Sequence, residues 1–135
     1  DDMNILVIVG AGRKNGNTDR LAEAFMAGAR EAGHTLAKAF LERLYAVAEK
    51  DDNPPKGRYE RHAQKDCALL MTAADDFFWT FEQAVSYYRF NCVNYPGWVD
   101  RGMVLAGGCG GSPDKRHIDD TGHLETAHAL GQSLH

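Results

Sequence analysis

The residues best suited to chemistry lie in the stretch GAGRKNGNT, residues 10–18, between the apolar run NILVIV and the amphipathic stretch DRLAEAFMAGA. Its spacing fits neither of the two best-known phosphate loops, G-x-x-x-x-G-K-[ST] and G-x-G-x-x-G. Backbone N–H groups in a tight glycine turn, followed by a helix N-terminus, nevertheless form a favourable environment for an anion. We therefore predict that this stretch binds a phosphorylated ligand.

The segments on either side of this stretch predict a strand, a glycine turn and a helix. Residues 5–9 are a continuous and mostly β-branched apolar run, which is typical of a strand buried on both faces of a parallel sheet. After it, Asn17 or Thr18 is the expected N-cap of the helix, and Gly33 is its expected stop. The helix is indicated by apolar residues at helical spacing: Leu21, Ala22, Phe25, Met26 and Ala29.

The remainder of the chain predicts two further strands and three further helices. We expect helices over 37–49 and 80–93, a last helix from Asp120 or Thr121, and strands over 67–72 and 103–106. A helix directly after the first helix interrupts the strand–helix alternation of an α/β fold, because a second strand is expected there.

Length and charge restrict the class of protein. The chain has 135 residues and a net charge of −4, which indicates one domain over 3–135 and gives no sign of binding to nucleic acid or to an anionic membrane. Asp1 and Asp2 precede Met3, and we interpret them as residues that do not belong to the fold. The longest apolar run is too short to span a bilayer. Three widely spaced cysteines argue against a disulfide framework, so we expect a cytoplasmic protein.

Several segments together resemble one family. MNILVIVGAGRKNGNTDRLAEAFMAGAREAGH is similar to the opening of the NADPH-dependent FMN reductase family of flavodoxin-like proteins, whose loop typically reads G-S-x-R-x-x-x-N-T. AKAFLERLYA resembles that family's third helix, CALLMTAADD its fourth strand and following loop, and GMVLAGGCGG with TGHLETAHALGQSL its fifth strand and last helix. The resemblance implies an α/β, flavodoxin-like, doubly wound parallel sheet of strand order 2-1-3-4-5. It also implies a homodimer or homotetramer with flavin at the subunit interface.

One part of the family pattern has no counterpart. The family's second strand, second helix and third strand would fall between Leu36 and Ala37, and such elements amount to about 35–50 residues. We expect that the sequence joins two pieces around a missing segment, so that strands 2 and 3 are absent. A genuine deletion, rescued by domain swapping, is the alternative.

The resemblance places FMN on two loops. The first would hold the phosphate through the Arg13 fork, through Asn17 and Thr18, and through backbone N–H groups, and Ala11 replaces the family's usual Ser. The second would lie against the flavin ring. The expected binding residues are Gly10, Ala11, Arg13, Asn15, Gly16, Asn17 and Thr18 in the first loop, and Thr72, Ala73, Ala74 and Asp75 in the second. The alternatives are a plain glycine turn with a solvated Arg13 and an ordinary loop after a strand.

The expected function is an FMN-dependent oxidoreductase that passes hydride from NAD(P)H to a quinone, a flavin or a similar acceptor. The flavin carries the chemistry, so no catalytic side chain is assigned. No metal site is expected, since Cys109, His117 and His123 lack ligand spacing. The alternatives are a non-enzymatic electron carrier and a flavin-free interaction protein of the same fold. Phe77, Phe78 and Trp79 are expected to shield the flavin, to form a subunit contact or to pack in the core.

Overall fold

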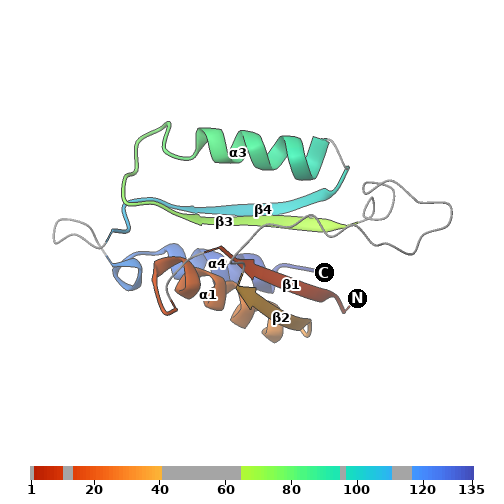
Figure 1. Cartoon of the computed structure of the whole chain (residues 1–135). Coiled ribbons are helices and arrows are strands. Elements are labelled where there is room, and N and C mark those ends of the chain that lie inside the picture. Colours follow the sequence, from red (N-terminus) through yellow and green to blue (C-terminus); the bar gives the residue numbers. More distant parts are fainter. Residues whose placement is uncertain (1, 11–13, 41–64, 95–96, 111–116) are drawn as a thin grey trace.

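The computed structural model describes residues 2–10, 14–40, 65–94, 97–110 and 117–135, with backbone alone at 39–40. The described chain is a mixed α/β fold (Figure 1). Its elements are β1 (Asn4–Val9), α1 (Asn17–Glu31), β2 (Thr35–Phe40), β3 (Asp66–Thr72), α3 (Glu82–Tyr88), the π-helical η1 (Arg89–Asn94), β4 (Val99–Ala106), the 3₁₀ turn η2 (Ile118–Asp120) and α4 (His123–Gln132).

The described strands form two separate sheets. β1 pairs with β2, β3 pairs with β4, and both pairs are parallel. Parallel strands joined through helices agree with the expected α/β class. Within the described residues, however, β1 and β3 are not paired and no strand lies between them, so the single sheet of order 2-1-3-4-5 is not observed.

The second strand is present, and its expected absence is wrong. β2 runs through Leu36 and Ala37, which pair consecutively with Ile5 and Leu6 of β1. The interruption expected between these two residues therefore falls inside a continuous strand. The helix expected over 37–49 is likewise wrong over 37–40, and the rest of it lies outside the described residues. The local apolar spacing suits a helix, but pairing with β1 gives this segment a ladder of hydrogen bonds that local propensity does not anticipate.

Helices α1 and α4 pack directly against each other, and both lie beneath the β3–β4 sheet (Figure 1). They run in the same direction, because Asn17 at the start of α1 contacts Ile118 shortly before α4, and His34 contacts Leu134 after the last turns of both helices. Two glycines allow a close crossing. A Cβ atom on Gly28 would lie 1.9 Å from the carbonyl oxygen of His128, and one on Gly131 would lie 2.0 Å from that of Phe25. Val7, Val9, Val104 and Ala106 of the two sheets complete one shared core with these helices.

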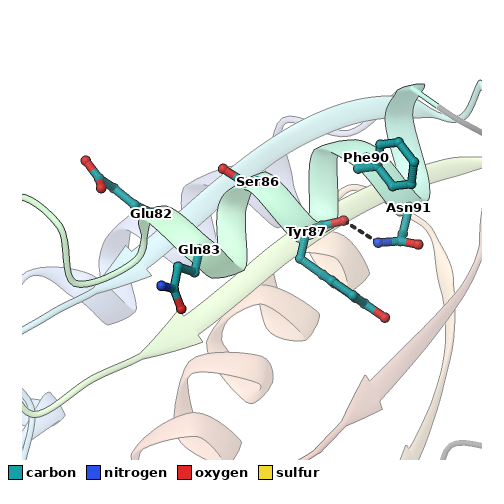
Figure 2. A pocket seen from close by; sticks show the side chains of 6 residues that line it. All are labelled: Glu82, Gln83, Ser86, Tyr87, Phe90 and Asn91. Carbon is teal, nitrogen blue, oxygen red and sulfur yellow. Dashed lines mark hydrogen bonds between the residues drawn. The ribbon is translucent and has the colours of Figure 1, made fainter.

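Helix α3 covers the opposite face of the β3–β4 sheet (Figure 1). The helix expected over 80–93 is confirmed by α3 and η1, and Tyr88 turns inward. The Tyr88 hydroxyl donates to Asp100 Oδ1 at 2.9 Å. The outer side of the same helix carries Tyr87 and Phe90, whose exposed fractions are 70% and 60% (Figure 2). Two aromatic side chains therefore face solvent.

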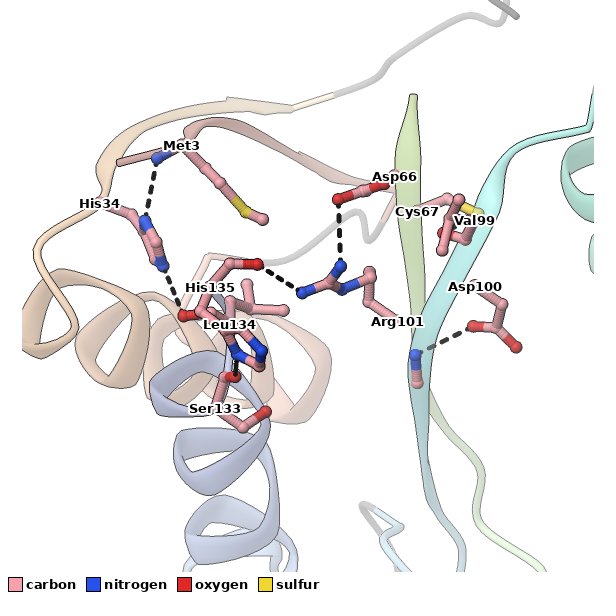
Figure 3. Close-up of polar contacts among 11 residues, drawn as sticks. Met3, His34, Asp66, Cys67, Val99, Asp100, Arg101, Ser133, Leu134 and His135 are labelled. Atoms are coloured by element: carbon pink, nitrogen blue, oxygen red, sulfur yellow. Dashed lines mark hydrogen bonds and ion pairs between the residues drawn. The ribbon is translucent and has the colours of Figure 1, made fainter. Parts of the chain in front are cut away.

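A buried histidine joins the two ends of the described chain (Figure 3). The N–H of Met3 donates to His34 Nδ1 at 3.0 Å, and His34 Nε2 lies 2.9 Å from the carbonyl oxygen of Leu134. Since Nδ1 accepts a hydrogen bond, the ring proton lies on Nε2 and is donated to Leu134. Nearby, Arg101 Nη2 donates to the carbonyl oxygen of His135 and ties β4 to the residues after α4.

Replacing His34 by alanine is expected to lower the free energy of unfolding by about 2 kcal/mol, because a buried donor or acceptor left without a partner costs about 1–3 kcal/mol. Chemical denaturation followed by circular dichroism measures this loss. The control is His128→Ala, which removes only a surface pair with Glu31 and should cost less than about 1 kcal/mol. Equal losses in both variants would contradict a bridging role for His34.

One face of the β1–β2 sheet is uncovered in the described part of the chain. Leu6 and Ile8 of β1 point to this face and are exposed. The expectation of burial on both faces is therefore wrong for β1 as described, because α1 and α4 cover the other face only. Across the described ranges, no helix has the length and apolar character needed to cross a membrane.

Candidate functional site

The two loops expected to bind one ligand meet at the carboxyl ends of the strands. Thr18 lies in the first turn of α1, after the loop that follows β1, and Thr72 is the last residue of β3. Their hydroxyl oxygens lie 2.6 Å apart in a direct hydrogen bond. Ligands of α/β proteins commonly bind at the carboxyl ends of parallel strands. This contact links the two predicted loops although their strands belong to different sheets.

The N-terminus of α1 is not capped as expected. Its N-cap residue is Gly16, and no side chain makes a capping hydrogen bond there, so Asn17 and Thr18 do not fill that role. The preceding Asn15 has a left-handed φ of 60°, which Asn tolerates better than most residues. The first N–H groups of a helix have no partner within the helix. Without a side-chain cap, this end of α1 suits an anion.

Asp19 occupies the inner side of the first turn and is a residue that the sequence analysis missed. Its carboxylate accepts from the N–H of Asn15 at 2.8 Å, so the backbone donor of Asn15 is already engaged. The side chain is 5% exposed and forms an ion pair with Lys38 of β2. Lys38 also pairs with Glu23 at 2.6 Å. The charge of Asp19 is thus balanced mainly by Lys38 of β2.

Both members of this ion pair have shifted pKa values. The hydrogen bond from Lys38, followed by the one from Asn15, holds the pKa of Asp19 below its usual range. Burial alone lowers the pKa of Lys38, but its bonds to Asp19 and Glu23 outweigh burial and raise it. Both groups therefore stay charged across neutral pH. The pattern TLAKAF could have indicated this pair, because in a strand its alternation puts Lys38 on the face turned to α1.

The second loop is held by β4. The N–H of Ala73 donates to the carbonyl oxygen of Ala106 at 3.0 Å, and that of Cys109 donates to the carbonyl oxygen of Ala73 at 2.9 Å. Both backbone polar groups of Ala73 are therefore engaged within the protein. Its N–H is therefore already satisfied by β4. Ala74 and Asp75 follow and are exposed.

The residues before α4 close the site from another side. The N–H of Ile118 donates to Asn17 Oδ1 at 3.4 Å, and Arg20 forms a 2.5 Å ion pair with Asp119. His123 Nε2 lies 3.1 Å from the carbonyl oxygen of Gly107, the first residue after β4. Asn17 therefore has a structural contact that competes with its expected role in holding a ligand.

The structure describes most but not all of the expected binding residues. Thr18 and Thr72 contact each other, Gly16 and Asn17 lie in the adjoining turn, and Gly10 is exposed at the end of β1. Ala11 and Arg13 lie outside the described residues. Every expected binding residue that the structure describes is exposed or half-buried: Gly10, Asn15, Gly16, Asn17, Thr18, Thr72, Ala73, Ala74 and Asp75.

The aromatic residues after the second loop are not packed in the core. Phe77 stacks on Trp79 with ring centroids 4.8 Å apart, and Phe78 meets the edge of Trp79. All three are exposed, Phe78 by 85%. The expectation that these three aromatic residues pack in the core is therefore wrong. The two other expected roles, shielding the flavin and forming a subunit contact, stay predictions.

The three cysteine thiols all have raised pKa values. Burial raises the pKa of the Cys67 thiol, and the same cause raises the pKa of Cys92 and of Cys109. A thiol needs a lowered pKa to act as a nucleophile near neutral pH. No group of three or more His, Cys, Asp or Glu side chains is arranged for a metal ion in the parts of the chain that the structure covers.

Comparison with known proteins gives no relative. No protein-family model, no curated protein and no solved structure matches this chain.

Proposed function

We propose that this chain is an FMN-dependent oxidoreductase that takes hydride from NAD(P)H and passes electrons to a quinone, a flavin or a similar small acceptor. FMN would lie at the carboxyl ends of β1 and β3, with its phosphate at the loop before α1 and its ring against residues 72–75. The electron carrier and the flavin-free interaction protein are the rival functions.

The observation that carries this proposal is the 2.6 Å hydrogen bond between the hydroxyls of Thr18 and Thr72. The resemblance assigns the phosphate to the loop of Thr18 and the ring to the loop of Thr72. One ligand can touch both loops only if they are adjacent, and this contact makes them adjacent. Because β1 and β3 are not paired, their adjacency does not follow from the sheet.

The described residues fit the phosphate of FMN at the first turn of α1. No side chain caps this end of the helix, and Gly16 adds no side-chain bulk. A phosphomonoester carries about −1.5 to −2 charges near pH 7, which the positive end of a helix dipole stabilises. Asp19 is the opposing charge, and its ion pair with Lys38 offsets it.

When bound, FMN would supply the hydride and electron transfer. The chain's own groups would bind and orient it. The Thr18 and Thr72 hydroxyls would hold the two loops at one spacing. The backbone of Ala73, fixed by β4, would keep the second loop in place. No described side chain is assigned a proton-transfer step.

A double-mutant cycle at Thr18 and Thr72 tests this function. FMN and riboflavin are titrated by flavin fluorescence against the protein and against Thr18→Val, Thr72→Val and the double variant. Each single variant should weaken FMN binding by about 3- to 10-fold, as expected for the loss of one hydrogen bond. The double variant should bind FMN about as tightly as either single variant does, because each single substitution already removes the contact between the two hydroxyls. Thr35→Val, at the opposite end of β2, is the control and should not change FMN affinity.

Oxidation of NADPH with and without added FMN and a quinone separates the rivals. The proposed enzyme should oxidise NADPH only with FMN present. FMN binding without NADPH oxidation would support the electron carrier. Absence of FMN binding would support the flavin-free interaction protein and would overturn the proposal.

A further inference from the structure

The Asp19 carboxylate reaches back from α1 to the loop that precedes the helix. Asp19 is in the first turn of α1, and its Oδ2 accepts from the N–H of Asn15 at 2.8 Å. A Glu or Gln at the same helix position often accepts instead from the N–H of the N-cap residue, which here is Gly16. The bond from Asp19 therefore holds the loop, while the N-terminus of α1 has no side-chain cap.

Asn15 has a backbone conformation that needs support. Its φ is 60°, and within the described ranges it is the only residue other than glycine with a positive φ. This left-handed region is unfavourable for residues with a side chain, although Asn tolerates it better than most. Asn15 is exposed, so core packing does not fix its backbone. The bond to Asp19 is the described contact that holds this turn.

The position of Asp19 is itself fixed from β2. Its Oδ1 accepts from Lys38 Nζ, so the two carboxylate oxygens have different partners. Lys38 also pairs with Glu23 at 2.6 Å. Only 5% of the Asp19 side chain and 17% of the Lys38 side chain are exposed, which leaves the pair little freedom to move. An ion pair that served only to hold β2 against α1 would not need the bond to Asn15.

We propose that Asp19 is a positioning residue, which holds the turn of Asn15 and Gly16 in the conformation that receives the phosphate of the ligand. The inference deepens the proposed function and rests on it, because that proposal assigns the phosphate to this turn. Asp19 acts through Asn15 and does not bind the ligand itself, since its two oxygens are engaged by Asn15 and Lys38. The turn is then ordered before the ligand arrives, and a preformed site binds more tightly.

A positioning role and a simple charge effect predict opposite results. If only the negative charge of Asp19 mattered, removing it would tighten the binding of FMN, because like charges repel. If Asp19 acts through Asn15, removing the acceptor weakens the binding of FMN. Riboflavin lacks the phosphate, so its affinity should not depend on this turn.

A matched pair of variants isolates the acceptor. Asp19→Asn with Lys38→Met keeps an oxygen that can accept from Asn15, whereas Asp19→Ala with Lys38→Met does not. The two double variants have the same net charge, and neither leaves a buried charge without its partner. Titration followed by flavin fluorescence should show FMN binding about 5- to 10-fold weaker for the alanine variant than for the asparagine variant. The two variants should bind riboflavin equally.

Amide hydrogen exchange at Asn15, measured by NMR spectroscopy, tests the same contact without flavin. The N–H of Asn15 should exchange about tenfold faster in the alanine variant than in the asparagine variant, because it has lost its acceptor. The control is Glu23→Ala, which removes the more exposed carboxylate partner of Lys38. This control should change neither the exchange at Asn15 nor the affinity for FMN.

The outcomes separate this inference from the proposed function. Equal FMN affinities in the matched pair, or equal exchange at Asn15, would overturn the positioning role and leave the proposed function standing. Riboflavin binding that weakens together with FMN binding would show that Asp19 supports the fold in general, which also overturns it. If the intact protein binds no FMN, the proposed function fails, and the positioning role fails with it.

Discussion

Replacement of Gly131 by alanine is expected to destabilise the protein by about 3 kcal/mol, as measured by chemical denaturation. The added Cβ would lie 2.0 Å from the carbonyl oxygen of Phe25 in α1, a backbone atom that no rotamer change can move. The two helices would have to separate, and the core that they share with both sheets would open. Gly28→Ala should act similarly, because its Cβ would meet the carbonyl oxygen of His128 in α4.

The sign of this effect makes the test decisive. Helix propensity alone predicts that alanine in place of a helical glycine stabilises the protein by about 1 kcal/mol. The control is Gly122→Ala before α4, where the nearest atom to an added Cβ is a Glu125 side-chain oxygen at 3.6 Å. We expect a change of at most about 1 kcal/mol there. Stabilisation by Gly131→Ala would show that α1 and α4 do not cross at these glycines.

Replacing Lys38 by methionine is expected to cost about 3–5 kcal/mol, because it leaves the carboxylate of Asp19 buried without its partner. The Asp19 and Lys38 side chains are only 5% and 17% exposed. The double variant Asp19→Asn with Lys38→Met removes both charges, and the asparagine oxygen can still accept from the N–H of Asn15. It should be more stable than Lys38→Met alone. A larger loss in the double variant would contradict a buried ion pair.

The pH dependence of stability follows from the directions of the two pKa shifts. The lowered pKa of Asp19 gives stability that is present above its unfolded value of about 3.9 and lost as pH falls through the folded value. The raised pKa of Lys38 gives stability that is present below about 10.4 and lost as pH rises further. In Lys38→Met, protonation of Asp19 relieves the buried charge. The deficit of this variant relative to the intact protein should therefore shrink between pH 7 and pH 3.

Local patterns in the sequence predicted the elements whose packing follows their own periodicity. The spacing of Leu21 and Phe25 predicted α1, and Gly33, with a φ of +95°, ends it as expected. The apolar runs over 67–72 and 103–106 predicted β3 and β4, and the last helix was placed within a few residues. In α1 and β4 the side chains that favour the element include those that face the core, such as Leu21, Phe25 and Val104.

Features that depend on distant partners were not predictable in the same way. β2 was assigned to a helix because its strand state depends on β1, a partner outside the local window. Asp19 was missed because only the fold brings Lys38 to it. For the candidate site, the two loops were predictable from their residues, whereas the engagement of the Asn15 and Ala73 N–H groups depends on contacts with Asp19 and β4. The exposed position of Phe78 also departs from what hydrophobicity alone predicts.

The parallel pairing of both sheets also affects how the chain folds. Asn4 is paired with Thr35 and Asp66 with Val99, so neither ladder starts from a hairpin, and each closes a long loop before its first strand-to-strand hydrogen bond forms. His34 and Leu134 are separated by 100 positions and still share a buried hydrogen bond. Contacts between distant residues slow folding, because the entropy of loop closure is lost before they stabilise the chain. We therefore expect α1 to form early and its docking with α4 to limit the folding rate. Before this docking the strand edges are unpaired, so they can pair with strands of other chains.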